Sequence, residues 1–347
     1  MSSVPVFVGL DYHASSIQVC VVDAAGTVLV NSKRASSVMD VVSLIEPLGC
    51  VQRVAVEACS GAADFGDHLS RHTGWRVSLS NTSIVSRMRS VVDKTDRTDA
   101  RVLADLCRTN YLPEVWLAPE PIRELRTLVR RRHQLTDGLR ETKQRIKALL
   151  REKRLVPPPE TGARWTRRYR RWLETLEVSL TTRMVINDLL GSLDAESAQR
   201  ARLDEALKLI GAGDRLIQKL LGIKGVGIVT ACTLRAVVGR FDRFRNAKQF
   251  ARYCGLTPRN ASSGERTADS GLVRAADPGL KSMLVQVAHR VARFEKKWSQ
   301  MLDGLVERGK PKCVAIVAVA NRWARCTWHE MKVLGEPGME GLALKAA

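Results

Sequence analysis

The sequence predicts an α/β domain at the N-terminus followed by a mainly α-helical remainder. Two observations carry this prediction. Runs rich in β-branched residues alternate with helix-patterned segments over about the first 110 residues. From about Pro121 onward the strand pattern disappears, and apolar residues recur with helical spacing instead. We therefore expect three parts, at residues 1–120, 121–215 and 216–347.

The N-terminal part is expected to begin with an antiparallel meander, because its first three apolar runs are separated by short polar or glycine-containing turns. Strands and helices then alternate. The expected strands are 4–10, 17–23, 27–31, 53–58 and 75–80, and the expected helices are 38–45, 64–72 and 99–110.

Two long amphipathic segments, 122–154 and 169–222, predict paired or coiled helices in the middle part. Three consecutive prolines at 157–159 separate them, since proline cannot lie inside a helix. Farther on, residues 220–239 (LLGIKGVGIVTACTLRAVVG) have the pattern of a helix-hairpin-helix motif, which offers backbone N–H groups to a phosphate backbone. A helix–helix turn without a ligand is the alternative interpretation.

Composition indicates a polyanionic partner. The 347 residues include 56 Lys and Arg against 36 Asp and Glu, a formal net charge of +20. The 45% of hydrophobic residues argues against disorder, and no apolar stretch is long enough to cross a membrane. Without a signal-peptide pattern, we expect a cytoplasmic protein. The eight cysteines form no C-x-x-C pair, which predicts reduced, buried thiols rather than a zinc site.

The positive charge is concentrated in residues 123–171, which hold 17 basic and 5 acidic side chains, whereas residues 1–115 hold 11 and 12. Trp165, Tyr169 and Trp172 lie among these charges and predict stacking surfaces for RNA. A solvated helix face is the alternative. The candidate nucleic-acid contacts in this segment are Arg130, Arg131, Arg132, Arg167, Arg168, Arg170 and Arg171.

Four acids form a candidate metal site. Asp11 and Glu57 each end an expected strand, and their carboxylates meet at one sheet edge if those strands are neighbours. Asp96 and Asp99 are three residues apart at a helix start and therefore share a face. Four hard oxygen donors suit Mg²⁺, and two such ions clamp the oxygens of a phosphoryl transfer. For each acid alone, a turn or an N-cap is the competing interpretation.

A polar loop in the C-terminal part holds Ser262 and Ser263 just before a glycine. Serines are common in such turns, which is one interpretation. The other is that one of them is a nucleophile stabilised by neighbouring arginines. The hairpin glycines at 225 and 227 lack the Lys-Ser/Thr of a nucleotide-binding P-loop. The candidate nucleic-acid contacts of this part are Lys224, Arg259, Arg266 and Arg274.

Four segments together resemble a known family. They are VGLDYHASSIQVCVVD, VAVEACSG, KTDRTDARVLA and GLTPRNASSG. Their order and approximate spacing are similar to those of the DEDD-type insertion-sequence recombinases, which include the Piv invertases and the bridge-RNA-guided transposases. The resemblance extends over nearly the whole chain. It implies a RuvC-like RNase H fold at the N-terminus, a coiled-coil middle region and a C-terminal transposase domain.

The resemblance also implies a site and partners. Asp11, Glu57, Asp96 and Asp99 match the family's metal-binding tetrad, with Mg²⁺ as cofactor, and Ser263 matches its nucleophilic serine. A structured guide RNA is implied that pairs with donor and target DNA.

The expected function is therefore RNA-guided DNA transposition through a phosphoserine-linked strand. Because long helical arms commonly pair, we expect a homodimer or homotetramer with no membrane association. Two alternatives stay open: a RuvC-like junction endonuclease that uses water as nucleophile, and an inert RNA- or DNA-binding protein.

Overall fold

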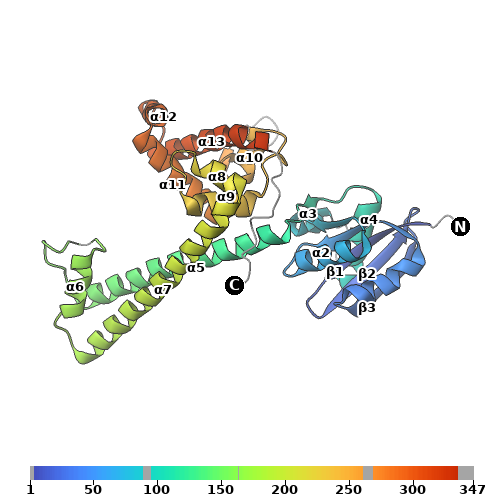
Figure 1. Ribbon diagram of the computed structural model, residues 1–347, viewed down its shortest axis with the longest axis horizontal. Helices are drawn as coiled ribbons and strands as arrows, with labels where there is room; N and C mark the ends of the chain where they lie inside the picture. The colour runs from blue at the N-terminus through green and yellow to red at the C-terminus, as the bar shows by residue number, and fades with distance from the viewer. Residues whose placement is uncertain (1–3, 89–94, 163, 261–268, 335–347) are drawn as a thin grey trace. The chain divides into compact units, whose positions relative to one another are not determined.

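The computed structural model describes residues 4–88, 95–162, 164–260 and 269–334, and it divides into two units, Met1–Glu120 and Pro121–Ala347 (Figure 1). The further boundary at residue 215 stays a prediction. Among the helices of these described residues, none combines the length and the apolar character that crossing a membrane requires.

The first unit is built on a six-stranded sheet with the order β3-β2-β1-β4-β5-β6. The predicted antiparallel meander is confirmed for the first three strands, and the next two run parallel to β1. The short last strand was not predicted, because two residues carry no periodicity. The strands are β1 (Pro5–Tyr12), β2 (Ser16–Asp23), β3 (Val28–Ala35), β4 (Cys50–Glu57), β5 (Val77–Ser80) and β6 (Glu114–Val115).

Helices cover both faces of this sheet. On one face, α1 (Val38–Ile45) and α2 (Ala62–Thr73) pack on the strand side chains of Val6, Val8 and Leu10. The other face is covered by α4 (Asp96–Arg108), whose Ala100 and Ala104 share an apolar cluster with Cys20 and Val22. A short helix, α3 (Thr82–Met88), was not predicted. Because strand side chains alternate, Gly9 and Asp11 lie on the face opposite Val8 and Leu10, which is the face that α4 covers.

Gly9 permits a close approach of α4 to β1. A Cβ atom at Gly9 would lie 2.0 Å from the carbonyl oxygen of Ala100 and 2.5 Å from the backbone nitrogen of Ala104. These are backbone atoms, so a side chain at residue 9 would force the helix away from the sheet. The first turn of α4 is therefore held directly over the end of β1.

The second unit begins with two long helices, α5 (Glu120–Glu152) and α7 (Leu180–Gly213), which run beside each other, with α6 (Arg167–Thr175) at one end (Figure 1). The segment 169–222, expected as one helical stretch, is instead three helices. Ser179 caps α7, and Asp214 caps α8 (Arg215–Leu221); each side chain accepts a hydrogen bond from a first-turn N–H. At both breaks a polar N-cap residue begins a new helix, which the apolar periodicity alone does not reveal.

The remaining elements are mainly helical. They include two short antiparallel strands that were not predicted, because so few residues carry no clear periodicity. The elements are α9 (Ile228–Val238), α10 (Ala247–Tyr253), β7 (Pro258–Asn260), β8 (Asp269–Leu272), α11 (Pro278–Phe294), α12 (Lys296–Glu307) and α13 (Lys312–Met331).

An ion pair buried between α8 and α9 ties this part together. Arg235 Nε lies 2.7 Å from Asp214 Oδ2, and the two side chains are 3% and 2% exposed. Asp214 also accepts from the backbone N–H of Ile217, and Arg235 donates to the Gly239 carbonyl. Both charges are therefore paired and hydrogen-bonded, as burial requires.

The expectation of buried thiols is wrong for three of the eight cysteines. All eight are free, and Cys50, Cys59 and Cys313 are exposed. Four others are buried, and burial raises the pKa of the Cys20 thiol to about 11.

Candidate metal centre and nucleic-acid interface

Asp11 and Glu57 lie side by side because their strands are parallel neighbours. Gly9 pairs with Ala55 and Leu10 with Val56, so the next residues along β1 and β4 are the two acids. Both strands reach the same sheet edge in the same direction. The adjacency on which the sequence hypothesis depended is therefore present.

The first turn of α4 supplies Asp96 and Asp99. The N-cap is Thr95, which forms a capping box with Thr98: each threonine hydroxyl accepts a hydrogen bond from the other's backbone N–H. The alternative that Asp96 merely caps this helix is therefore wrong. Asp99 directly precedes Ala100, the residue that touches Gly9, and so it faces the end of β1.

Three of the four acids converge. Asp11, Glu57 and Asp99 each offer a carboxylate oxygen, and these oxygens all lie within 4.8 Å of one another. Asp11 is 5% exposed and Asp99 is 3% exposed. Like charges this close and this buried repel one another, and a hard divalent cation with oxygen ligands would neutralise them. The donor set therefore fits Mg²⁺ or Mn²⁺.

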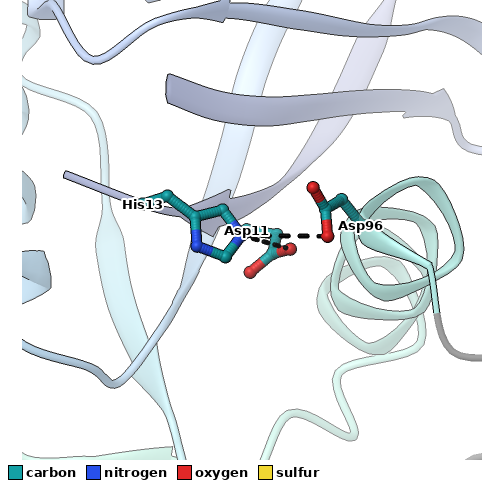
Figure 2. Close-up of side chains that lie close together, drawn as sticks. All are labelled: Asp11, His13 and Asp96. Carbon is teal, nitrogen blue, oxygen red and sulfur yellow. Dashed lines mark ion pairs between the residues drawn. The ribbon is translucent and has the colours of Figure 1, made fainter. Parts of the chain in front are cut away.

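Asp96 belongs to a second group, which includes a histidine that the sequence analysis missed. The ring of His13 points between Asp11 and Asp96, with its Nε2 3.3 Å from Asp11 Oδ2 and 3.8 Å from Asp96 Oδ1 (Figure 2). These three side chains also bring potential ligand atoms within 4.8 Å of one another. The signal was the position of His13 two residues after Asp11, immediately beyond a strand.

A polar network holds the start of α4 against the sheet. Gln18, which pairs with Asp11 across β1 and β2, donates to Asn31 Oδ1 at 2.7 Å. Asn31 in turn donates to the Arg97 carbonyl at 3.0 Å, and the Arg97 guanidinium donates back to the Asn31 carbonyl. These hydrogen bonds hold the first turn of α4, and with it Asp96 and Asp99, against β3.

Cys59 lies close to the acids, in surroundings that disfavour its thiolate form. Its Sγ donates to the Tyr12 carbonyl at 3.3 Å. Partial burial of its sulfur, and then the negative charges of Glu57 and Asp11, raise the pKa of this thiol above its ordinary value. In the absence of a metal ion, these surroundings therefore favour the protonated thiol over the thiolate.

The predicted cations of residues 123–171 fall into two groups. Arg130, Arg131, Arg167, Arg168 and Arg171 are exposed. Arg132 instead bridges α5 to α7 through Asp204, with Nε 2.9 Å from Oδ1. Arg170 pairs with Asp194 and, at 2.8 Å, with Glu174. Arg132 and Arg170 therefore hold the helices together through these pairs.

The aromatic residues near α6 are mainly part of a core. Tyr169 is 2% exposed and packs between Trp165 and Trp172, with ring centroids 5.2 and 5.4 Å away. The expectation that Tyr169 offers a stacking surface is wrong, because its ring fills the apolar cluster between α5, α6 and α7. Trp165 and Trp172 are partly buried.

The candidates of the C-terminal part are only partly within the described residues. Lys224, Arg259 and Arg274 are exposed, and Lys224 lies in the connection between α8 and α9. Ser263 and Arg266 lie outside the described residues, as does Ser262.

Comparison with known proteins finds similarity to transposases along most of the chain. Residues 8–154 match the DEDD transposase model of IS110, described as "Transposase", and residues 217–302 match the model "Transposase IS116/IS110/IS902 family". The chain is 29% identical over 336 residues to the transposase for insertion sequence element IS1111A of Coxiella burnetii, covering 92% of this chain and 88% of that protein. It is 28% identical over 331 residues to a probable family 20 transposase of Pseudomonas aeruginosa, covering 92% and 95%.

The two models cover both the unit that holds the four acids and the helical part that follows α7. A transposase acts on DNA, in agreement with the expected substrate. Over residues 8–154 and 217–302, the chain is similar to the IS110/IS116 family of DEDD transposases.

Proposed function

We propose that this transposase cuts DNA at a metal centre held by Asp11, Glu57, Asp96 and Asp99. The convergence of Asp11, Glu57 and Asp99 within 4.8 Å is the observation that carries the proposal. Divalent cations held at such a centre would polarise the scissile phosphate and stabilise the attacking and leaving oxygens. The acids would orient that chemistry, because two come from one sheet edge and two from the helix docked on it.

The sheet topology supports a RuvC-like RNase H fold for the first unit. An antiparallel meander is followed by two strands parallel to β1, with acids at the ends of β1 and β4. The third and fourth acids lie on the helix that covers this face. The middle helices and the α8–α9 hairpin are proposed as a coiled-coil region and a helix-hairpin-helix.

Water is the nucleophile that the described residues support best, since the centre itself consists of metal-binding groups. In this reading, water attacks the phosphorus, and the leaving deoxyribose oxygen departs with a proton. The junction-nuclease alternative is therefore favoured over serine chemistry by the geometry alone.

A serine nucleophile is a second candidate, favoured by one observation. The segment 217–302, which includes Ser263, matches a transposase model, and a water mechanism leaves it without a chemical role. Here Ser263 Oγ would attack the phosphorus, forming an Oγ–P bond as the P–O bond to deoxyribose breaks. A second deoxyribose hydroxyl would then displace the serine and restore the diester.

Denaturing electrophoresis of end-labelled insertion-sequence DNA, incubated with the full chain and its copurified RNA, separates these proposals. Metal-dependent cleavage with free DNA ends supports water. A protein–DNA adduct that is lost in Ser263→Ala and kept in Ser262→Ala supports serine. No metal-dependent cleavage in either form would overturn the proposed function.

Guide-RNA binding is proposed for the exposed cations near α6. Replacing Arg167, Arg168 and Arg171 with Gln should weaken RNA retention and lower the log–log salt slope by up to about 2, because each lost phosphate contact contributes about 0.7. Filter binding at several salt concentrations measures this slope. The control replaces three other exposed cations, Lys296, Arg308 and Lys312, and an equal loss there would mean that the effect is only net charge.

The Gly9→Ala variant should cut DNA about 10²-fold more slowly than the wild type. The added Cβ collides with the backbone of α4, and a displacement of about 1 Å in a catalytic group costs about that factor. Single-turnover cleavage measures the rate. Gly191→Ala on α7 is the matched control, because its Cβ would meet nothing within 4 Å. A wild-type rate in Gly9→Ala would contradict the role given to the helix approach.

A further inference from the structure

His13 lies among the acids of the metal centre without belonging to the DEDD tetrad. We propose that His13 is a further metal ligand, which forms with Asp11 and Asp96 a second cation position of nitrogen and oxygen donors. The first position, made by Asp11, Glu57 and Asp99, has oxygen donors alone. This inference rests on the proposed function, since it assigns a ligand within the same centre.

The donor distances fit one cation between the three side chains. His13 Nε2 lies 3.3 Å from Asp11 Oδ2 and 3.8 Å from Asp96 Oδ1, and the three residues bring ligand atoms within 4.8 Å of one another (Figure 2). Donors bound to one divalent ion at about 2.1 Å stand about 3 to 4.2 Å apart. The same ring nitrogen faces both carboxylates, as a single ion between them requires.

The backbone fixes the place of His13. It is the first residue after β1, and its N–H donates to the Ser16 carbonyl at 2.9 Å, which closes the turn into β2. Asp96 is held from the other side by the capping box of α4. The imidazole is therefore brought to the acids by the strand end and its turn.

The two positions differ in exposure. The Asp11 side chain is 8% exposed, whereas those of His13 and Asp96 are 51% and 49% exposed. Asp11 is common to both groups, and its two carboxylate oxygens allow it to serve both positions. The position at His13 is thus the more open one, with room for water or a phosphate oxygen as further ligands.

The mixed donor set predicts metal preference. Mn²⁺ is a first-row transition metal that accepts an imidazole nitrogen beside carboxylate oxygens, whereas Mg²⁺ is more strictly an oxygen-binding ion that keeps several waters. The position at His13 should therefore favour Mn²⁺ over Mg²⁺ more strongly than the carboxylate position does.

Electron paramagnetic resonance of the Mn²⁺-loaded full chain tests the ligand directly. Electron spin-echo modulation from ¹⁴N is expected in the wild type and should change to the ¹⁵N pattern when histidine is ¹⁵N-labelled. His13→Ala should lose this coupling and raise the Mn²⁺ dissociation constant of one position at least about 10-fold, since even outer partners of ligands contribute 10- to 100-fold. His68→Ala, at an exposed histidine on α2, should keep both properties.

Replacing the imidazole by a carboxylate provides an independent test. His13→Asp makes the position all-carboxylate, so the ratio of Mn²⁺ to Mg²⁺ affinity should fall relative to the wild type. Circular dichroism and thermal unfolding establish that each variant is folded.

Two results would overturn the inference. Asp11-dependent Mn²⁺ binding without nitrogen coupling, or with coupling that persists in His13→Ala, removes His13 as a ligand and leaves the proposed function of the acids intact. If the full chain binds no Mn²⁺, or if Asp11→Asn does not weaken its binding, the metal centre and the His13 assignment are overturned together.

Discussion

Asp11→Asn is expected to reduce DNA cleavage by about 10³-fold or more while leaving nucleic-acid binding close to that of the wild type. Asp11 belongs to both groups of potential ligands, so its loss weakens every metal position of the centre. Metal-ion stabilisation of a phosphoryl-transfer transition state is worth several kcal/mol, and each 1.4 kcal/mol is about tenfold in rate. Single-turnover cleavage and filter binding measure the two properties separately.

Asp40→Asn is the control for this substitution, because Asp40 is an exposed acid on α1 and belongs to neither group of ligands. It should cut at the wild-type rate. Efficient cleavage by Asp11→Asn in Mg²⁺, or equal losses in both variants, would contradict the assignment of Asp11 to the metal centre.

Arg235→Ala is expected to lower the free energy of unfolding by about 3–5 kcal/mol. Removing the guanidinium leaves Asp214 buried and negatively charged, and breaking a buried pair on one side has about that cost. Because Asp214 also caps α8, its carboxylate cannot simply turn away from the pair. Urea unfolding followed by circular dichroism measures the change.

The exposed pair of Lys208 and Glu205 on α7 is the comparison for this prediction. Lys208→Ala should leave the free energy of unfolding close to that of the wild type, because exposed pairs contribute little. Replacing Arg235 and Asp214 together with apolar residues of similar size should recover much of the loss, because no unpaired charge remains. A loss of less than about 1 kcal/mol in Arg235→Ala would mean that Asp214 reaches water in the folded protein.

The sheet and its acids were largely predictable from sequence. β-Branched runs fixed the first strands, and the position of Asp11 and Glu57 at strand ends predicted their adjacency once β1 and β4 were parallel neighbours. The KTDRTDAR segment predicted a helix start bearing two acids on one face. These features depend on local periodicity, which a single sequence carries.

The features that sequence could not supply depend on contacts between distant segments. The need for glycine at residue 9 follows from the backbone of α4, which is about 90 residues away. His13 can be recognised as a potential metal ligand only from the position of Asp96 in the folded chain. Likewise, Tyr169 and Arg170 look like exposed nucleic-acid contacts in sequence, yet one fills a core and the other pairs with Asp194.

The central claim is that the four acids hold divalent metal for DNA cleavage, and its most direct test is cleavage as a function of metal. The full chain, with its copurified RNA and end-labelled insertion-sequence DNA, is assayed in EDTA and then titrated with Mg²⁺ or Ca²⁺. The account predicts no cleavage in EDTA, saturable recovery with Mg²⁺, and binding of Ca²⁺ without cleavage. Cleavage at an undiminished rate in EDTA would contradict it.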